Sequence, residues 1–349
     1  MKFDKLKLQI VFLTLFFLTM DCGPGRTFEI VDNKIVDNQY DNHPPFNDSS
    51  PKISRIMSSI AMINCTAYYK QYEFDPEDKV YKEDVTDADI LKKGDNFNIS
   101  RNSAGTSLLL SISGNKVLLL TCNHIIDYPE ETYDYYSKYF SRNYVNIFLK
   151  KQKQTQFVTL DNNVVDLEII AQNKRKDIAL LGGTSSGKVM NISEPDFKIG
   201  NASDLNTGNF VYIFGFPKGH KMVSSGLISM EGSRTDQFMM DIPFNRGMSG
   251  GIVFAIRDDS PNFEMIGMAT SAAADFEYIL TPEEEIIQDE GFNQSLPYQG
   301  NIYIEEKPRI RYGITYVNSI EVIMNFLRRN RRLIENAGYD IDHILGEKE

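Results

Sequence analysis

The stretch SAGTSLLLSISGNKVLLLTCNHII, residues 103–126, decides the fold. It holds two apolar runs of strand length, SLLLSI and KVLLLT, with Gly114 and Asn115 at the turn between them. Glycine and asparagine favour the tight turns that join antiparallel strands, so this stretch predicts a β-hairpin. A histidine, His124, follows the second strand directly.

The same pattern continues on both sides of this hairpin. From about residue 55 onward, short apolar runs recur, and many of them end at turn residues. Dense short strands with few helical stretches predict an all-β fold, either a sandwich or a barrel. The further runs are NYVNIFL (143–149), DLEIIA (166–171), DIALL (177–181), NFVYIFGF (209–216), GIVFAI (251–256) and FEMIGMATS (263–271).

Three segments depart from the strand pattern. Residues 128–142 are polar and tyrosine-rich, and we expect a long loop or a short helix there. Residues 280–299 are acidic and predict a surface insertion. The last segment is a helix that begins after Ser319 and carries apolar side chains on one face. These side chains are Ile320, Ile323, Phe326 and Leu327.

The N-terminal residues 1–22 predict an export signal. A lysine-containing start precedes an apolar run of eleven residues, 10–20. A bilayer span needs about 20 apolar residues, whereas a signal-peptide core is shorter. Cys22 follows at once, as in the lipidated cysteine of bacterial lipoproteins, although Asp21 stands where that motif prefers a small residue. The alternative is a cleaved leader or an uncleaved anchor in which Cys22 is incidental.

Composition outlines the rest of the chain. Residues 23–54 are rich in Asn, Asp and Pro and predict a disordered tether, followed by one folded domain over 55–335 and a tail over 336–349. We therefore expect an exported protein that is periplasmic, at the cell surface or secreted. The net charge of −11 argues against a nucleic-acid partner, because phosphate binding needs surplus Lys and Arg.

Two further cysteines, Cys65 and Cys122, would remain after export. They could pair in an oxidising compartment, while a buried free thiol is the alternative for Cys122, which lies in an apolar strand. Cys and His residues are not spaced as metal ligands, so neither a metal nor a cofactor is expected.

Three residues form a candidate catalytic set. Among the four histidines, only His124 directly follows an apolar strand, where a general base can be held rigidly. Ser249 lies in the sequence GMSGG, whose glycines allow a turn that exposes the hydroxyl. The same turn would aim the N–H groups of Gly247 and Ser249 at one point, as an oxyanion hole. Asp177 begins an apolar strand after a charged turn and could orient the imidazole.

An α/β-hydrolase elbow is the alternative context for such a serine. There the nucleophile precedes a helix, and the histidine follows the serine in the chain. In this chain a strand, GIVFAI, follows Ser249, and His124 precedes it. Both features disfavour the hydrolase fold.

These segments together resemble the trypsin-like (chymotrypsin-fold) serine peptidases, nearest to the bacterial high-temperature-requirement (Deg-type) branch. The resemblance covers roughly residues 100–328. It rests on the hairpin-His segment and on KRKDIALL, NFVYIFGFPKGHKMVSSGLIS, FMMDIPFNRGMSGGIVF and IRYGITYVNSIEVIMNFL, in the family's order. It implies two six-stranded antiparallel β-barrels with a C-terminal helix, and a triad of His124, Asp177 and Ser249 in the cleft between them. No PDZ module is expected, because only about 20 residues follow residue 328.

The resemblance also bears on specificity. Pro243 stands where trypsin-type enzymes carry the aspartate that selects Lys and Arg, so that preference is not expected. The pocket wall would be the small and apolar stretch of Met268, Ala269, Thr270 and Ser271, which suits a small to medium apolar side chain before the cut. Met248 stands where digestive enzymes carry an aspartate that pairs with a newly cut N-terminus, so no such switch is expected.

The sequence as a whole predicts an exported serine endopeptidase that acts on protein or peptide substrates without a cofactor. The alternative is a catalytically idle protein of the same fold that serves as a cell-envelope binding protein. The chain from about residue 271 to 311 is longer than usual for the family. The resemblance places this acidic insertion near the substrate pocket, where it could shape access.

Overall fold

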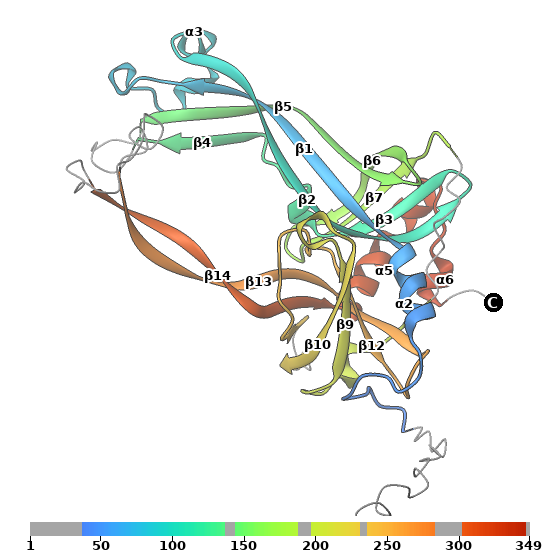
Figure 1. Cartoon of the computed structure of the whole chain (residues 1–349). Helices are drawn as coiled ribbons and strands as arrows, with labels where there is room; N and C mark the ends of the chain where they lie inside the picture. The colour runs from blue at the N-terminus through green and yellow to red at the C-terminus, as the bar shows by residue number, and fades with distance from the viewer. Residues whose placement is uncertain (1–36, 137–143, 188–196, 231–235, 283–301, 347–349) are drawn as a thin grey trace, which may run out of the picture. The chain divides into compact units, whose positions relative to one another are not determined.

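The computed structural model describes residues 37–136, 144–187, 197–230, 236–282 and 302–346 (Figure 1). These residues belong to one compact unit, Asp37–Glu349. The predicted export signal and Cys22 lie outside the described residues. In the described part of the chain, no helix is both long enough and apolar enough to cross a membrane.

The first barrel is built from antiparallel strands in the N-terminal half. Their order is β1 (Ile60–Glu73), β2 (Asp95–Ser113), β3 (Lys116–Thr121), β7 (Ile178–Thr184), β6 (Asn163–Asn173) and β5 (Val145–Leu160). A further pairing between β1 and β5 closes these strands into a barrel. The strand β4 (Glu131–Tyr135) pairs with the outer part of β5 and is the seventh of the sheet.

The second barrel repeats this plan in the C-terminal half. Its order is β12 (Ile252–Ile256), β9 (Phe210–Gly215), β10 (Met222–Met230), β11 (Gln237–Met240), β14 (Ile302–Ser319) and β13 (Phe263–Pro282). Pairing between β12 and β13 closes it, and the short strand β8 (Lys198–Ile199) adds parallel to β13. The predicted all-β fold of two six-stranded barrels is confirmed.

Helices are few, and the long one lies at the C-terminal end. It is α5 (Ile320–Asn336), which begins after Ser319 as predicted and buries the four predicted apolar side chains. The other α-helices among the described residues are α2 (Ser50–Ser58), α3 (Ala88–Leu91) and α6 (Asp342–Leu345). Short 3-10 helices are η1 (Pro76–Asp78), η2 (Asp84–Thr86), η3 (Asn123–Ile125), η4 (Ala202–Asp204) and η5 (Pro217–Gly219).

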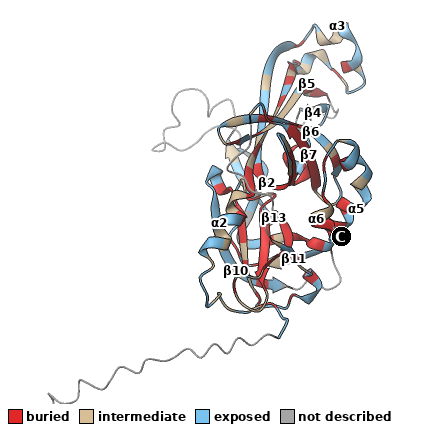
Figure 2. Cartoon of the chain, turned by 90° about the vertical axis from the view of Figure 1, so that its right-hand side faces the viewer, coloured by how far each residue is buried: buried red, intermediate tan, exposed pale blue. Residues whose placement is uncertain are grey.

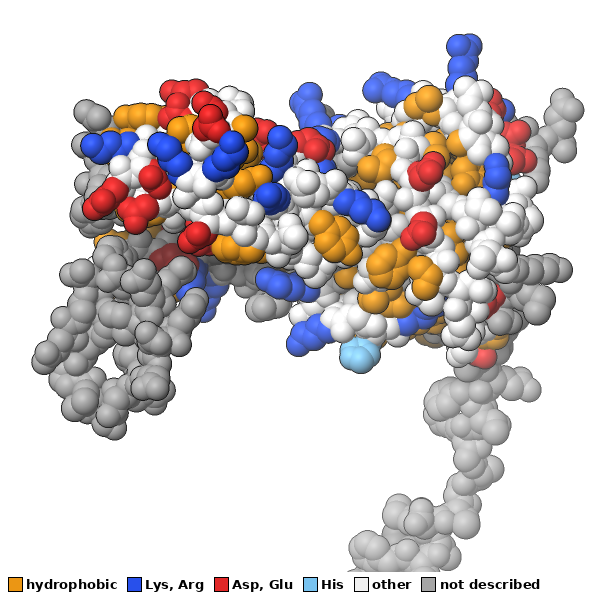
Figure 3. Space-filling view, turned by 90° about the horizontal axis from the view of Figure 1, so that it is seen from above, with side chains coloured by type: hydrophobic (Ala, Val, Ile, Leu, Met, Phe, Trp, Pro, Cys, Tyr) orange, Lys and Arg blue, Asp and Glu red, His pale blue; other side chains and the backbone are white. Residues whose placement is uncertain are grey.

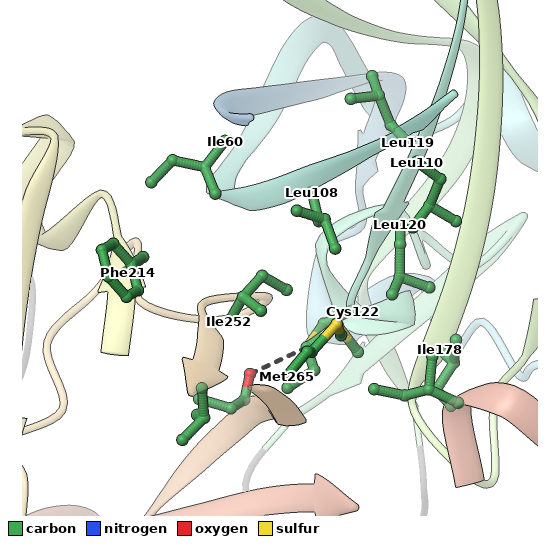
Figure 4. Packing of buried hydrophobic residues seen from close by; sticks show 14 of the residues in the cluster. Ile60, Leu108, Leu110, Leu119, Leu120, Cys122, Ile178, Phe214, Ile252 and Met265 are labelled. Carbon is green, nitrogen blue, oxygen red and sulfur yellow. Dashed lines mark hydrogen bonds between the residues drawn. The ribbon is translucent and has the colours of Figure 1, made fainter. Parts of the chain in front are cut away.

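One continuous apolar core joins the two barrels, and Figure 2 shows buried residues concentrated within both. The predicted hairpin strands supply much of it, because every residue from Val117 to Thr121 is fully buried. Cys122 lies at the seam between the barrels, with Ile178 of the first and Ile252 of the second nearby (Figure 4). Side chains that immediately follow β3 are therefore held rigidly by close packing.

The C-terminal residues predicted as a tail pack onto the first barrel. Tyr339 is buried and lies against Gly182 of β7, where any side chain would collide with its ring. Ile341, Ile344 and Leu345 are also buried. The sequence pattern is too short and irregular to reveal this docking, which depends on the space that Gly182 leaves.

The described part of the predicted tether, residues 37–54, also differs from the prediction. Tyr40 is buried, and its hydroxyl donates to Glu264 at 2.8 Å, while the Arg257 guanidinium lies 4.0 Å from the centre of its ring. Burial raises the pKa of the Tyr40 hydroxyl well above its ordinary value. Asp258 accepts hydrogen bonds from the N–H groups of residues 37 and 38. Polar residues here form specific bonds to the second barrel, which composition alone cannot distinguish from disorder.

An arm extends from the first barrel. We use this name for residues 69–99 of β1, β2 and their connection, together with β4 and residues 145–151 of β5. The arm has a small apolar core in which Phe148 stacks on Tyr72 and Tyr133, with ring centres 5.8 and 5.0 Å apart. The predicted loop or helix at 128–142 instead contains β4, in which Tyr133 packs on this core. Residues 137–143 lie outside the described part.

A ribbon extends from the second barrel (Figure 1). We use this name for Ala273–Pro282 of β13 and the residues 302–311 of β14 that pair with it without interruption. The predicted acidic insertion at 280–299 therefore begins within the end of a strand pair. Its residues 283–299 lie outside the described part.

Candidate active site

His124 lies in the short helix η3, immediately after the buried strand β3. Its backbone N–H donates to Asp177 Oδ1 at 2.8 Å, and its ring Nδ1 lies 2.7 Å from Asp177 Oδ2. Both carboxylate oxygens thus contact the same histidine. This double contact fixes the ring orientation and leaves Nε2 as the ring nitrogen that can exchange a proton with a substrate or nucleophile.

Asp177 owes its position to a tight turn between β6 and β7. The residue has φ of +52°, in the left-handed region that aspartate tolerates better than most residues. Its N–H bonds back to the Lys174 carbonyl at 3.3 Å, and β7 begins at the next residue. The charged turn in the sequence therefore presents a carboxylate, beside the histidine, at the start of a strand whose first six residues are buried.

Ser249 completes a hydrogen-bonded series of three side chains. Its Oγ lies 2.9 Å from His124 Nε2. The series runs from a carboxylate through an imidazole to a hydroxyl, which is the arrangement that activates a serine for attack on a carbonyl. The structure thus brings together all three side chains that the sequence predicted.

Two N–H groups of the backbone around Ser249 have no acceptor among the described residues. Lys218 N–H bonds to the Arg246 carbonyl at 2.7 Å, and Gly251 N–H bonds to the Met248 carbonyl at 2.7 Å. The N–H and C=O of a trans peptide point in opposite directions. The N–H groups of Gly247 and Ser249 therefore point away from these anchored carbonyls, and among the described residues neither has a hydrogen-bond acceptor. Two such donors suit a developing oxyanion.

Gly247 is required in this turn for two reasons. Its φ is +94°, and a Cβ at this position would lie 2.1 Å from the Phe216 carbonyl oxygen. Real Cβ atoms do not approach backbone that closely, so the turn would have to move.

Thr106 of β2 is a residue that the sequence analysis missed. Its N–H donates to the Ser249 carbonyl at 2.7 Å, and its Oγ1 donates to the Gly247 carbonyl at 2.7 Å and accepts from Phe216 N–H at 2.9 Å. The first barrel therefore holds the nucleophile turn of the second barrel by two direct bonds. The sequence gives no signal for this role, because Thr106, directly before the run SLLLSI, has the features of an ordinary strand residue.

Cys122 precedes His124 by two residues. Both Cys122 and Cys65 are free, buried thiols. The Cys122 Sγ lies 3.4 Å from the Ala269 carbonyl of the second barrel. Burial raises the pKa of the Cys122 thiol well above its ordinary value, and the nearby Asp177 carboxylate adds to this rise. The pKa of Cys65 is raised to about 11, also chiefly by burial.

Cys122, His124 and Asp177 have ligand atoms within 4.8 Å of one another. A metal would require the Cys122 thiolate, which its raised pKa disfavours, and would compete with the His124–Asp177 hydrogen bonds. The donor set therefore suits a hydrogen-bond network better than a metal.

A cleft of about 520 Å³ opens beside Ser249. Residues of both barrels line it: His124, Asp177, Lys218, Phe244, Asn245, Arg246, Ser249, Thr270, Ser271 and Ala272. Of the predicted pocket residues, Thr270 and Ser271 line this cleft. The structure places Met268 and Ala269 in the core instead, fully buried, because Met268 still pairs with β12 and the Ala269 backbone bonds to Gly250 and Gly251. Pro243 is exposed and is not among the lining residues.

Comparisons with known proteins complete this description. A search of the curated proteins found no match. Among solved structures, the chain is similar to the serine endoprotease from Yersinia pestis, with a TM-score of 0.42 and 13% identity, covering 82% of this chain and 67% of that one. Residues 105–268 match the family model for the trypsin-like peptidase domain. The matched range contains His124, Asp177 and Ser249.

Proposed function

We propose that this protein is an exported serine endopeptidase that cleaves protein or peptide substrates through an acyl-enzyme. The observation that carries the proposal is the unbroken series from Asp177 through His124 to Ser249, with contacts of 2.7 and 2.9 Å. The match to the trypsin-like peptidase domain supports it. The proposal includes a place in the cell envelope. It is supported by the similarity of the motifs to the Deg-type branch and by the predicted export signal, with Cys22 as a candidate lipid anchor.

The first half of the reaction forms the acyl-enzyme. His124 Nε2 takes the proton of the Ser249 hydroxyl as Oγ bonds to the substrate carbonyl carbon. The carbonyl oxygen becomes an oxyanion, which the N–H groups of Gly247 and Ser249 stabilise. Asp177 stabilises the positive imidazolium. The C–N bond then breaks, the amine leaves with the proton from His124, and Ser249 holds the acyl group as an ester.

The second half releases the product. A water molecule gives a proton to His124 Nε2 while its oxygen bonds to the acyl carbon. The ester C–O bond breaks, the proton returns from His124 to Ser249 Oγ, and a carboxylic acid leaves. All proton transfers use the one nitrogen that the Asp177 contacts leave free.

The cleft suggests which substrates fit. Thr270, Ser271 and Ala272 are small and leave room for a small to medium apolar side chain before the cut. Lys218 and Arg246 add two cationic side chains to the lining. An acidic or carboxylate-bearing neighbour of the cut is therefore compatible with the cleft, while Lys and Arg are not favoured there.

Covalent labelling with a fluorophosphonate probe tests the proposal. We expect wild-type protein to be labelled, and Ser249→Ala and His124→Ala to remain unlabelled. Ser203→Ala, an exposed serine of η4, is the matched control and is expected to label like wild type. The rate of peptide hydrolysis by Ser249→Ala should fall to a residual value roughly 10³–10⁴-fold above the uncatalysed rate in water. Failure of wild type to label or to cleave peptides would overturn the proposal in favour of an idle binding protein.

A further inference from the structure

The ribbon has two chemically different faces. Residues directly opposite each other on antiparallel strands share a face, and successive residues alternate between faces. Leu280 pairs with Ile304, and Phe276 and Tyr278 lie on the same face as Leu280, which is mainly apolar and includes one charged residue, Glu306, opposite Tyr278. The other face carries charges, with Glu277 and Arg309 in an ion pair and Lys307 paired with Glu305.

The apolar face is uncovered in the described part of the chain. Phe276 is 65% exposed, and Tyr278, Leu280 and Ile304 are 71–72% exposed. Soluble proteins rarely expose large apolar side chains side by side unless the patch binds a partner. A two-stranded ribbon alone is also marginally stable in water, so a partner strand would stabilise it.

One edge of β13 becomes free next to Ser249. Met268 is the last residue of β13 that pairs with β12, and the Ala269 backbone then bonds to Gly250 and Gly251. From Ser271 to Pro282, the described strands pair with β13 only along its β14 edge. The opposite edge starts at Ser271, which lines the cleft, and continues along the whole ribbon.

We infer that the ribbon is an extended recognition surface for the polypeptide substrate upstream of the cut. A substrate strand pairs antiparallel with the free edge of β13, and its alternate apolar side chains pack beside Phe276, Tyr278 and Leu280. The inference rests on the proposed function and names its substrate class: unfolded chains with alternating apolar residues well before the cleaved bond.

Direction and length follow from the strand geometry. Residue numbers of β13 increase away from Ser249, so an antiparallel partner runs toward Ser249, and the residues that precede the cut lie along the ribbon. Leu280 lies about nine residues beyond Ser271, or about 30 Å at 3.3 Å per residue. A peptide with only three residues before the cleaved bond therefore cannot reach the apolar face, whereas a peptide with about ten residues before it can.

Peptide binding to the inactive Ser249→Ala variant gives the first test. The probe is a fluorescent peptide of about 12 upstream residues, long enough to span the ribbon at 3.3 Å per residue, with apolar side chains at alternate positions. Replacing those side chains by serine should weaken binding about tenfold or more, measured by anisotropy. N-methylation at single upstream positions should weaken binding at every second position only, because alternate N–H groups face β13. Equal effects at neighbouring positions would overturn the strand pairing, and no effect of the serine peptide would overturn the apolar contact.

Cleavage by active protein gives the second test. The triple variant Phe276→Thr, Tyr278→Thr and Leu280→Thr retains strand-favouring residues but removes the apolar face. We compare kcat/KM for the long peptide with kcat/KM for a short peptide. The triple variant should lower the ratio of these two values about tenfold, mainly because KM for the long peptide rises. The matched control, Glu277→Thr with Arg309→Thr on the charged face, should leave the ratio unchanged.

The outcomes separate this inference from the proposed function. Short peptides that are cleaved without any gain from apolar extension would overturn the inference and leave the endopeptidase intact. Absence of cleavage of every peptide would overturn the proposed function, while the binding test still decides the inference. A dimer of wild type that the triple variant abolishes, with unchanged peptide affinity, would show that the face binds a second copy and would overturn the inference.

Discussion

The arm of the first barrel and the ribbon of the second barrel differ in the exposure of their apolar side chains, which are buried in the core of the arm and exposed on the ribbon. In the arm, Phe148 is buried to 1% exposure, and the Lys82 ammonium lies 4.8 Å from the centre of the Tyr133 ring. On the face seen from above, charged side chains of both signs are interspersed among the described residues (Figure 3). In the ribbon, Tyr278 and Leu280 are among the most exposed large apolar side chains.

This difference separates a structural extension from a recognition surface. The arm shows that this chain can cover an extended strand pair with its own residues, using the small core around Phe148. The ribbon could have been covered in the same way and is not, in the part that the structure describes. The ribbon also begins at the wall of the Ser249 cleft, whereas the arm has its own separate core. The ribbon leads away from the cleft that contains Ser249, and its uncovered apolar face favours a role in binding the proposed substrate.

Phe148→Ala tests whether the arm is self-contained. We expect the arm to lose about 3–5 kcal/mol of local stability, because a buried aromatic ring with two stacked partners is removed. Hydrogen exchange of β4 and residues 145–151 should rise, while cleavage of a short peptide stays at the wild-type rate. Phe148→Leu should have a smaller effect. Unchanged protection of the arm in Phe148→Ala would break the comparison.

Gly247→Ala tests the nucleophile turn of the second barrel. The added Cβ would meet the Phe216 carbonyl at 2.1 Å and displace an oxyanion donor, so kcat should fall about 10²–10³-fold. Gly114→Ala in the first barrel is the matched control. It also has positive φ, +66°, but no atom lies within 4 Å of the new Cβ. It should cost about 1–2 kcal/mol of stability and leave kcat unchanged. Equal effects on kcat would contradict the assigned turn.

Thr106→Val sharpens the contrast, because Thr106 is where the first barrel contacts the nucleophile turn. The change leaves the Gly247 carbonyl and the Phe216 N–H without a partner, at a cost of about 1–3 kcal/mol. We expect kcat to fall by roughly tenfold with little change in KM, since the turn is misaligned while the cleft remains. Thr106→Ser should restore kcat. If Thr106→Val changed thermal stability but not kcat, the proposed role of Thr106 in aligning the turn would be wrong.

Tyr278→Ser is expected to have the smallest effect on stability. The side chain is 72% exposed, so the free energy of unfolding should change by less than about 0.5 kcal/mol. Thermal or urea denaturation measures this, with Phe148→Ala as the contrasting large change. A substantial loss of stability would show that the ribbon face packs against another part of the chain, and the comparison with the arm would fail.

Much of the barrel architecture could be predicted from short local patterns. The alternation of apolar runs and turn residues around Gly114 predicted the hairpin, and the resemblance supplied the barrel count. The residues at strand ends, His124 and Asp177, were found because their positions next to buried strands have a physical meaning. Their contact with Ser249 required the resemblance, since no local pattern specifies which strand ends meet.

Features that depend on distant partners could not be predicted. Thr106 has no local signature, because its role comes from a turn more than a hundred residues away. Residues 37–54 have a composition typical of disorder, yet the Arg257 and Asp258 side chains hold the beginning of this segment in place. Met268 and Ala269 were expected in the pocket, but Met268 still pairs with β12 and the Ala269 backbone bonds to Gly250 and Gly251. The difference of two residues moves the pocket wall to Thr270, Ser271 and Ala272.

The bonds from Thr106 also set a time order for assembly. The strand β2 is synthesised long before the turn that contains Ser249, and the pairing of β1 with β5 can close the first barrel without it. The turn gains its two Thr106 bonds only when the second barrel docks. Reactivity is therefore expected to arise in one late step, after both barrels are complete. A chain that is still folding would then hold its histidine ready but have no aligned serine, and it would not digest its own unfolded part.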